Sequence, residues 1–419
     1  MLFKKEIKVK PNEVFTPKAP TVNEDMYISR PELEKKLKRA IDGTYHIIVH
    51  GDSGSGKSWL YKNVLKELNC EYITINLPNA SSNQSISETF KWYLSQIDEV
   101  KKVEYTEKKM AEVNGVVAKG QVDHSDKYII TEKEPFLQCL EYVRKKAKKK
   151  PALIVFENLE AVFEDEGLMK ELGNLILLLD DEIYAKYNVK FLIVGVPNGI
   201  KEYFSKAENA SSIDNRLEEI PEVSKLNNEQ VKNFVKKGFV EKLKIEMDDN
   251  QLSSLSDDVY WSTLGIPQRL HEYCLKTAYA LEDNYWNYDD ALLQSAKIDW
   301  INQSLTSNYT NIELLMNSRE TTVQRKNQVL YALGKVEKEE FKSSDIEEVV
   351  KIEFPLTTQA KMNIGQMLSE IANSDNPPIK KTPKGDSYTF VDPKFCMCLR
   401  MMLVKNDIEK IEKLPLNKI

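Results

Sequence analysis

The stretch that decides the fold is Gly51-Asp52-Ser53-Gly54-Ser55-Gly56-Lys57-Ser58, which fits the pattern G-x-x-x-x-G-K-[ST] at every fixed position. The run before it, Tyr45 to His50, is typical of a short buried strand, and Trp59 to Leu65 has the apolar spacing of a helix. A glycine-rich turn between strand and helix directs backbone N–H groups, and the positive end of the helix, toward phosphate groups. The stretch therefore predicts a nucleotide-binding site.

Each part of this stretch has an expected task. Lys57 would contact the β- and γ-phosphates of ATP, and the Ser58 hydroxyl would bind Mg²⁺. The other residues expected around the nucleotide are Gly51, Asp52, Ser53, Gly54, Ser55, Gly56 and Trp59. The alternative is a Gly/Ser turn that merely matches the pattern.

Composition sets limits on the class of protein. The chain has 419 residues, enough for two or three domains, and its 41% hydrophobic and 30% charged content is ordinary for a globular protein. We expect a soluble cytoplasmic protein with no membrane contact, because no apolar run reaches membrane-spanning length and the start lacks a signal-peptide core. The four histidines and five cysteines are too scattered for a metal enzyme, although Cys396 and Cys398 leave a metal half-site as an alternative to reduced structural thiols. A formal net charge of −6 means that nucleic acid would have to bind at a local basic patch.

Further strands and helices alternate after the first. Residues 71–77, 151–156 and 190–196 are apolar runs of strand length, separated by predicted helices. Continuous apolar strands separated by helices predict a parallel sheet covered on both faces. The predicted helices are 31–42, 85–100, 135–149 and 168–187, with a small hairpin at 113–122. The basic run that ends 135–149 is interpreted as a solvated helix end.

The strands stop near residue 227. The helices expected next are 228–243, 249–255, 266–281 and 288–302. From about Arg319 the pattern changes to helices at 323–333, 343–350 and 357–372, followed by a β-hairpin at 378–391. Three helices followed by a hairpin predict a winged helix-turn-helix.

A carboxylate is expected beside the phosphate loop. The strand 151–156 runs into Glu157, which can bind Mg²⁺ directly or through water, and a second carboxylate normally polarises the attacking water. Asn158 stands in that second position and cannot accept a proton, while Glu160 is a possible replacement two residues further on. The alternative is that Glu157 only caps the following helix.

The order of these motifs resembles that of AAA+ ATPases. The resemblance rests on Tyr27 to Arg30, the phosphate loop, Glu157, Asn198, Arg216 and Gly265-Ile266-Pro267-Gln268-Arg269. The C-terminal winged helix points to the branch shared by origin-recognition, STAND-type and transposition ATPases, and the ending Tyr388 to Phe395 is similar to the close of the winged helix in the last two groups. It implies an α/β P-loop NTPase parallel sheet with a helical lid and a C-terminal winged helix. The domains implied are an N-terminal arm at 1–24, the nucleotide-binding domain at 25–222, the lid at 223–318 and the winged helix at 319–419.

The resemblance also implies individual roles. Asn198 would sense the γ-phosphate, or else be a turn residue, and Arg269 would reach the nucleotide from the lid, or else be a surface arginine. Arg216 would act as an arginine finger toward a neighbouring subunit, or else form a salt bridge within its own chain. Tyr27 and Ile28 would pack near the adenine.

Two functions follow from this reading. Because the family usually has Asp then Glu where this chain has Glu157 and Asn158, we expect a slow ATPase: a STAND-type switch that controls assembly with itself or with an effector-bearing partner, as in phage defence. The alternative is a DNA-associated ATPase of the replication-initiation or transposition type, binding duplex DNA through the winged helix. The groups expected to touch DNA are Gln359, Lys361, Asn363, Gln366, Lys380, Lys381 and Lys384. The winged helix would otherwise serve protein contact.

Overall fold

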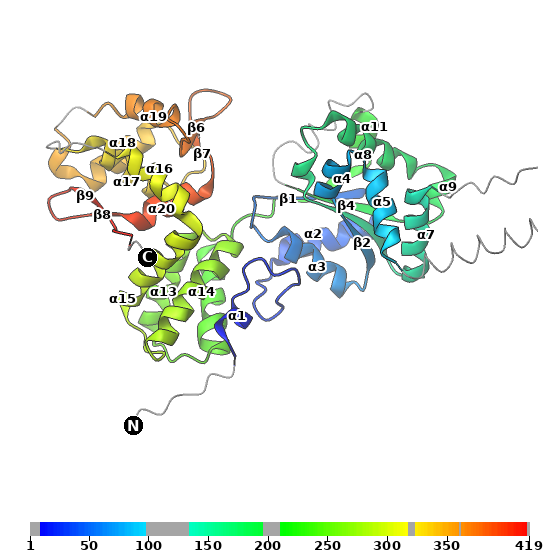
Figure 1. Cartoon of the computed structure of the whole chain (residues 1–419), viewed down its shortest axis with the longest axis horizontal. Helices are drawn as coiled ribbons and strands as arrows, with labels where there is room; N and C mark the ends of the chain where they lie inside the picture. The colour runs from blue at the N-terminus through cyan, green and yellow to red at the C-terminus, as the bar shows by residue number, and fades with distance from the viewer. Residues whose placement is uncertain (1–8, 98–133, 196–209, 317–322, 360–361, 417–419) are drawn as a thin grey trace, which may run out of the picture. The chain divides into compact units, whose positions relative to one another are not determined.

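The computed structural model describes residues 9–97, 134–195, 210–316, 323–359 and 362–416. The chain divides into two compact units (Figure 1): unit 2 is residues 29–224, and unit 1 combines residues 1–28 with 225–419. Among the described residues, no helix is both long enough and apolar enough to cross a membrane.

Unit 2 is built on a five-stranded parallel sheet. Its strands are β1 (His46–His50), β2 (Glu71–Asn76), β3 (Ala152–Glu157), β4 (Lys190–Gly195) and β5 (Leu217–Glu219), in the order β2-β3-β4-β1-β5. The four longer strands confirm the strands expected from the apolar runs. β5 was not expected from the sequence.

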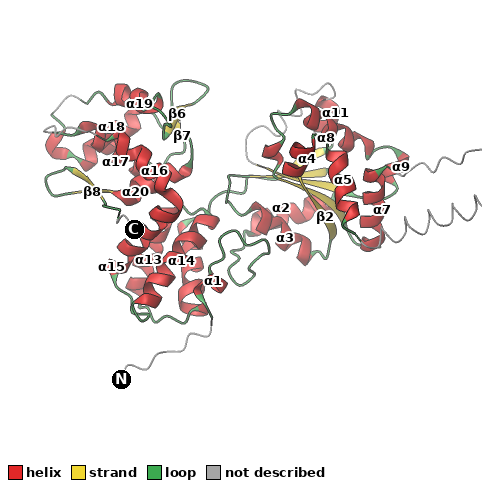
Figure 2. Ribbon diagram, viewed as in Figure 1, coloured by secondary structure: helices red, strands yellow, loops and turns green. Residues whose placement is uncertain are grey.

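Helices cover both faces of this sheet, as expected (Figure 2). One face packs against α2 (Pro31–Asp42) and α3 (Lys57–Glu67). The other packs against α4 (Leu77–Asn83), α5 (Ile86–Ser95), α7 (Pro135–Ala147) and α8 (Glu166–Leu178). Neighbouring residues of a strand enter opposite cores, so Ile47 and Val49 join the first and Ile48 the second. Double burial of this kind requires continuous apolar strands.

Three shorter elements complete unit 2. They are the 3₁₀ turn η1 (Leu159–Ala161), α9 (Glu182–Ala185) and α11 (Ala210–Asp214). The helix expected over 168–187 is therefore two helices. The hairpin expected at 113–122 lies outside the described residues.

Unit 1 begins its helical part at residue 228. Its elements are α12 (Asn228–Val235), the π-helical turn η2 (Lys236–Lys242), α13 (Asp249–Thr263), α14 (Pro267–Asp283), α15 (Asp290–Trp300), the π-helical turn η3 (Ile301–Leu305) and α16 (Thr306–Leu315). The four helices expected between 228 and 302 are all present, and α16 was not expected.

The N-terminal segment is part of unit 1. The short helix α1 (Pro11–Val14) leads to Phe15, which is fully buried against Phe234, Phe239 and His271. The Thr16 N–H donates to His271 Nδ1 at 3.0 Å. The segment 1–24, expected as an N-terminal arm, thus contributes Phe15 to the core of unit 1.

The C-terminal part of unit 1 contains three helices and a hairpin. They are α17 (Arg325–Lys335), α18 (Ser343–Glu353), α19 (Ile364–Ala372) and the antiparallel pair β6 (Ile379–Lys381) and β7 (Tyr388–Phe390). Phe341 adds an antiparallel bridge to Tyr388. The third helix, expected from Thr357, begins only at Ile364, after a 3₁₀ turn η4 (Pro355–Thr357).

Unexpected elements follow the hairpin. They are α20 (Pro393–Met402) and the antiparallel pair β8 (Leu403–Lys405) and β9 (Ile411–Lys413). α20 contacts both α13 and α17, and the Arg400 guanidinium lies 3.8 Å from the centre of the Trp261 ring. The segments 223–318 and 319–419 thus pack together within one unit. Cys396 and Cys398 are both buried in α20, where burial raises the pKa of each thiol.

Candidate nucleotide-binding site

The phosphate loop lies between β1 and α3, as expected. Gly54 and Gly56 have φ angles of 80° and 93°, a left-handed conformation that side-chain-bearing residues rarely adopt. A Cβ added to Gly51 would lie 2.5 Å from the backbone oxygen of Val223, so only glycine fits without movement of the backbone. The glycines at these positions therefore shape the loop directly.

Lys57 is the first residue of α3, and its side chain turns back over the loop. Its Nζ donates to the backbone oxygens of Gly51 at 2.7 Å and Asp52 at 2.9 Å. Burial lowers the pKa of Lys57, and the nearby carboxylate of Glu160, followed by Asp52, opposes that shift. The ammonium group is thus held at the loop, where phosphate oxygens could replace the two carbonyl groups as its hydrogen-bond acceptors.

Arg30 supports the loop from the start of α2. Its guanidinium Nη2 donates to the backbone oxygen of Ser55 at 2.7 Å, and only 8% of the residue is exposed. The Arg30 N–H donates to Glu34 at 2.8 Å, and the Ser29 hydroxyl donates to the other oxygen of Glu34 at 3.0 Å. The sequence placed Arg30 in the motif from Tyr27 to Arg30 but did not assign it to the site.

The chemistry of the donor set fits a magnesium nucleotide. Ser58 lies in the first turn of α3 and is partly exposed, and Glu157 is the last residue of β3. A hydroxyl and a carboxylate are oxygen donors of the kind that Mg²⁺ prefers. Asp52, Ser53 and Trp59 are partly or fully exposed around the loop.

Glu157 is anchored by α3. The Tyr61 hydroxyl donates to Glu157 Oε1 at 2.7 Å, and Lys62 Nζ lies 3.9 Å from the same oxygen. Burial, reinforced by the charge of Glu157, raises the pKa of Tyr61 far above its usual value, so the phenol remains a hydrogen-bond donor. The sequence did not single out Tyr61, whose buried position on α3 follows from the apolar spacing.

Asn158 has the backbone of a turn. Its φ is 61°, a left-handed conformation, and its side-chain amide donates to Asn76 Oδ1 at 2.7 Å. Asn76 is the last residue of β2, which pairs with β3. Position 158 therefore carries a neutral amide held by a second amide, and Glu160 follows in η1.

Arg216, which was expected to complete the site of a neighbouring subunit, lies just before β5, at the other end of the sheet from the phosphate loop. Arg216 pairs with Asp180 and donates to the Ser212 backbone oxygen, which is the intrachain salt bridge that the sequence left as an alternative. Asn198 lies outside the described residues.

Tyr27, Ile28 and Arg269 belong to unit 1. Arg269 Nη1 donates to both carboxylate oxygens of Glu272, at 2.7 and 2.8 Å, within α14. The Tyr27 backbone oxygen accepts a hydrogen bond from Lys237 at 3.1 Å, and Ile28 is buried. These contacts all lie within unit 1.

The residues expected to touch DNA are divided. Lys380 and Lys381 are exposed on β6, and Lys384 is exposed in the following turn. Lys361 lies outside the described residues. Of the other residues expected on the third helix, only Gln366 lies on α19. Gln359 precedes the helix, and Asn363 is its N-cap, with a left-handed backbone.

The comparisons with known proteins agree with this fold. Residues 40–204 match the family model described as an AAA domain. The Walker-type ATPase paby2304 of Pyrococcus abyssi has a similar structure, with a TM-score of 0.52 and 15% identity over 92% of this chain and 99% of that one. The ORC2 protein of Aeropyrum pernix, solved as ADPNP-ADP complexes, has a TM-score of 0.51 and 11% identity over 93% and 97% of the two chains. No curated protein matches. Residues 40–204 are therefore similar to an AAA domain, and the glycine-rich loop and the parallel sheet fit the P-loop α/β fold.

Proposed function

We propose that this chain binds ATP with Mg²⁺ at residues 51–58 and hydrolyses it slowly, as a switch that controls assembly with a partner. The observation that carries the proposal is the pairing of a fully formed phosphate loop with a neutral amide at position 158. The loop has Lys57 held over it, while the Asn158 amide is bonded to Asn76. A complete phosphate loop supports tight binding of ATP, and an amide at position 158 supports only weak activation of the attacking water.

Each group of the loop has one task in this proposal. The backbone N–H groups at the start of α3 and the Lys57 ammonium bind the phosphates. Ser58 and Glu157 hold Mg²⁺, which supplies charge neutralisation at the phosphates when bound. The Tyr61 hydroxyl fixes the orientation of the Glu157 carboxylate.

Activation of water is the weak step. An amide cannot take a proton from water, so Asn158 can only orient it. Glu160 is the carboxylate that could act as base, and its charge already acts on Lys57. We expect a turnover much slower than that of an ATPase with a glutamate at position 158.

The remaining assignments are part of the same proposal. Asn198 would sense the γ-phosphate, Arg269 would join the nucleotide by exchanging its Glu272 contact for phosphate, and Tyr27 and Ile28 would lie near the adenine. Arg216 would serve a neighbouring subunit only after release from Asp180. Arg269 and Arg216 would each give up an existing ion pair when ATP binds, which is how a switch differs from a preassembled catalyst.

The second candidate is a DNA-associated ATPase. We propose α17, α18, α19 and the β6–β7 hairpin as a winged helix-turn-helix, since their order matches that motif. Lys380 and Lys381, exposed on β6, favour contact with phosphates. Acidic partners occupy other lysines of this segment: Lys338 pairs with Asp345 at 2.6 Å, a partial neutralisation that weakens affinity for DNA.

The test is the mass of the protein in solution. The protein is measured without nucleotide, with ADP and with a slowly hydrolysed ATP analogue, each with and without duplex DNA. Assembly that needs the ATP analogue but not DNA supports the switch with itself as partner, and assembly that needs both supports the DNA-associated ATPase. Lys57→Ala is the control: it removes the phosphate contact, so undiminished ATP affinity in this variant would overturn the site assignment.

A stable monomer under all conditions leaves a separate partner protein, which is then sought by co-purification in the presence of the ATP analogue. The role in phage defence stays a prediction, tested by phage challenge of cells that carry wild-type protein or the Lys57→Ala variant.

A further inference from the structure

The end of α7 carries the densest group of positive charges in the chain. Within residues 144–150 six of seven side chains are basic, and Lys186 follows α9. We call these seven residues the α7 basic cluster: Arg144, Lys145, Lys146, Lys148, Lys149, Lys150 and Lys186. The formal net charge of the whole chain is −6, so this cluster is a local positive region in an acidic protein.

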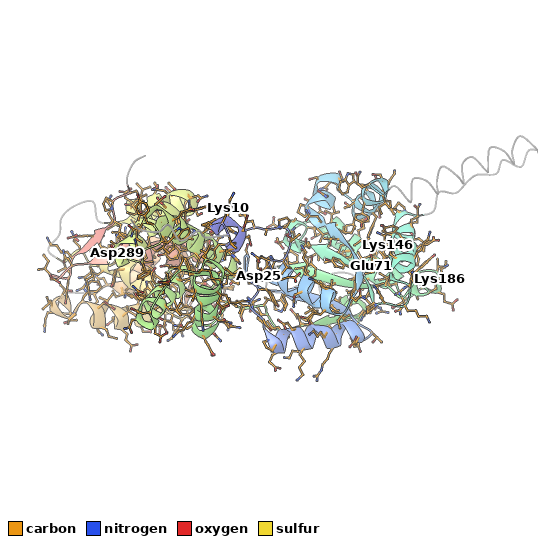
Figure 3. All side chains as sticks on the ribbon, turned by 90° about the horizontal axis from the view of Figure 1, so that it is seen from below. Lys10, Asp25, Glu71, Lys146, Lys186 and Asp289 are labelled. Atoms are coloured by element: carbon orange, nitrogen blue, oxygen red, sulfur yellow. The ribbon has the colours of Figure 1, made fainter. Side chains whose placement is uncertain are left out.

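Arg144 builds the cluster by joining two turns. Its guanidinium donates to the backbone oxygens of Lys148 and Lys150, at 3.2 and 3.0 Å, after the helix end. It also donates to the backbone oxygens of Tyr187, at 2.5 Å, and Asn188. Lys186 is thereby held at the same end of unit 2 as the lysines of α7, and Figure 3 shows Lys146 and Lys186 there.

The lysines have few local tasks of their own. Basic residues at a helix end often serve to satisfy its last carbonyl groups, but here Arg144 bonds the carbonyl groups of the turn. Lys150 donates to Asn69 Oδ1 at 2.8 Å, and Lys146 lies over the Tyr142 ring at 4.7 Å. Lys145, Lys148, Lys149 and Lys186 are exposed and form no ion pair with a described residue.

Little apolar surface accompanies these charges. Among the described residues, no large hydrophobic side chain from 141–151 or 186–188 is exposed, and Ile183 on α9 is an exposed apolar side chain close to Lys186 in sequence. Lys186 lies over the Tyr187 ring at 5.1 Å and so covers part of it. A protein partner is usually bound through apolar anchors, whereas a phosphate backbone is bound by cations alone. The adjoining strand β2 begins with the acidic residue Glu71, whose backbone N–H donates to the Pro151 backbone oxygen.

We propose that the α7 basic cluster binds the phosphate backbone of a nucleic acid. The four lysines without an ion pair (Lys145, Lys148, Lys149 and Lys186) provide the contacts, and Arg144 fixes the turns that carry them. The surface lies in the nucleotide-binding unit and not in the proposed winged helix. It depends neither on ATP nor on the β6–β7 hairpin, so it goes beyond the proposed function.

The expected binding depends on salt in a calculable way. Four phosphate contacts give a slope of log affinity against log salt of roughly −3.6 for duplex DNA, since each contact contributes about −0.9. Affinity should therefore fall roughly 150-fold between 50 and 200 mM salt. No preference for base sequence is expected, because lysines on phosphate read no base edge.

The experiment measures fluorescence anisotropy of labelled duplex DNA on the full-length protein across this salt range. The variant Lys145→Gln/Lys148→Gln/Lys149→Gln should weaken binding at 50 mM salt at least tenfold and reduce the slope by about 2.7. The matched control is Lys35→Gln/Lys36→Gln/Arg39→Gln on α2, which removes three exposed basic side chains and should leave most of the binding. The hairpin variant Lys380→Gln/Lys381→Gln/Lys384→Gln is measured beside it, because these lysines belong to the proposed winged helix. All substituted side chains are exposed, and ATP affinity reports that each variant is folded.

Three results would overturn the proposal. They are an unchanged slope in the α7 variant, a larger loss in the hairpin variant, and binding of an acidic polyglutamate peptide to these lysines in place of DNA. The last would assign the cluster to a protein partner. The Lys57→Ala variant tests the two proposals independently. If it loses ATP binding but keeps DNA binding, the α7 basic cluster acts independently of the nucleotide site.

Discussion

Replacement of Arg30 by methionine should loosen the phosphate loop while filling the same space. The bond at stake joins Arg30 Nη2 to the Ser55 backbone oxygen at 2.7 Å, in a setting where 8% of Arg30 is exposed. A hydrogen bond to a charged group contributes about 1.5–3 kcal/mol, and its loss leaves a buried carbonyl without that donor. We therefore expect unit 2 to lose about 2–3 kcal/mol of stability.

Binding should suffer less than stability. The hydrogen bond is present before ATP binds. Its loss lowers the affinity for ATP only to the extent that the free loop then adopts other conformations, which ATP must reverse on binding. If reordering the loop takes about half of the lost stability, the binding free energy of ATP weakens by roughly 1–1.4 kcal/mol, which is about a five- to tenfold loss of affinity. Lys at position 30 keeps the charge but not the planar fork, and should give an intermediate effect.

Two assays measure these effects separately. Hydrogen exchange of the amides in β1 and α3 reports the stability of unit 2, and calorimetric titration with ATP reports affinity. The control is Lys38→Met on α2, which removes a solvent-exposed ion pair with Glu67 and should change neither exchange nor affinity measurably. Arg30→Met with exchange and affinity equal to those of the control would refute the role given to Arg30.

Three further changes have defined outcomes. Asn158→Glu should speed ATP hydrolysis, at a cost of about 1 kcal/mol for the left-handed backbone; an unchanged rate that Glu160→Gln abolishes would assign the base to Glu160. Gly51→Ala brings a Cβ to 2.5 Å from the Val223 oxygen and should cost about 1–3 kcal/mol of unit 2 stability, seen as faster exchange in β1. Burial lowers the pKa of His271 to about 3 from 6.5, so the unfolded chain takes up the proton first as pH falls below 6.5. Unit 1 should therefore be about 2 kcal/mol less stable at pH 5 than at pH 7.5, and an imidazole NMR signal of His271 that titrates near pH 6.5 would contradict this.

The sequence predicted the nucleotide-binding half well because its signals are local. The strand, loop and helix from 45 to 65 needed only neighbouring residues, and double burial made β3 and β4 continuously apolar. β5 was not predicted because it spans three residues, of which only Leu217 is buried. Such a short segment has no recognisable alternation of apolar and polar residues. Its pairing with β1 is a tertiary effect.

Other features depended on distant partners. The third helix of the C-terminal segment starts late because Asn363 takes a left-handed backbone, which the apolar pattern does not record. Arg144 stood in a basic run interpreted as solvated, yet its acceptors include Tyr187 and Asn188, more than forty residues away in sequence. The partner of Arg216, Asp180, is 36 residues away, and the sequence left its role open for the same reason.

The burial of Phe15 in unit 1 has a consequence for synthesis of the chain. Its neighbours in the core, Phe234 and His271, emerge from the ribosome more than two hundred residues later. At roughly 5–20 residues per second, the N-terminal segment waits on the order of 10–50 s for them. During that time all of unit 2 is made, so it can fold first as a complete body between the two pieces of unit 1. The first residues translated are thus among the last to reach their final place.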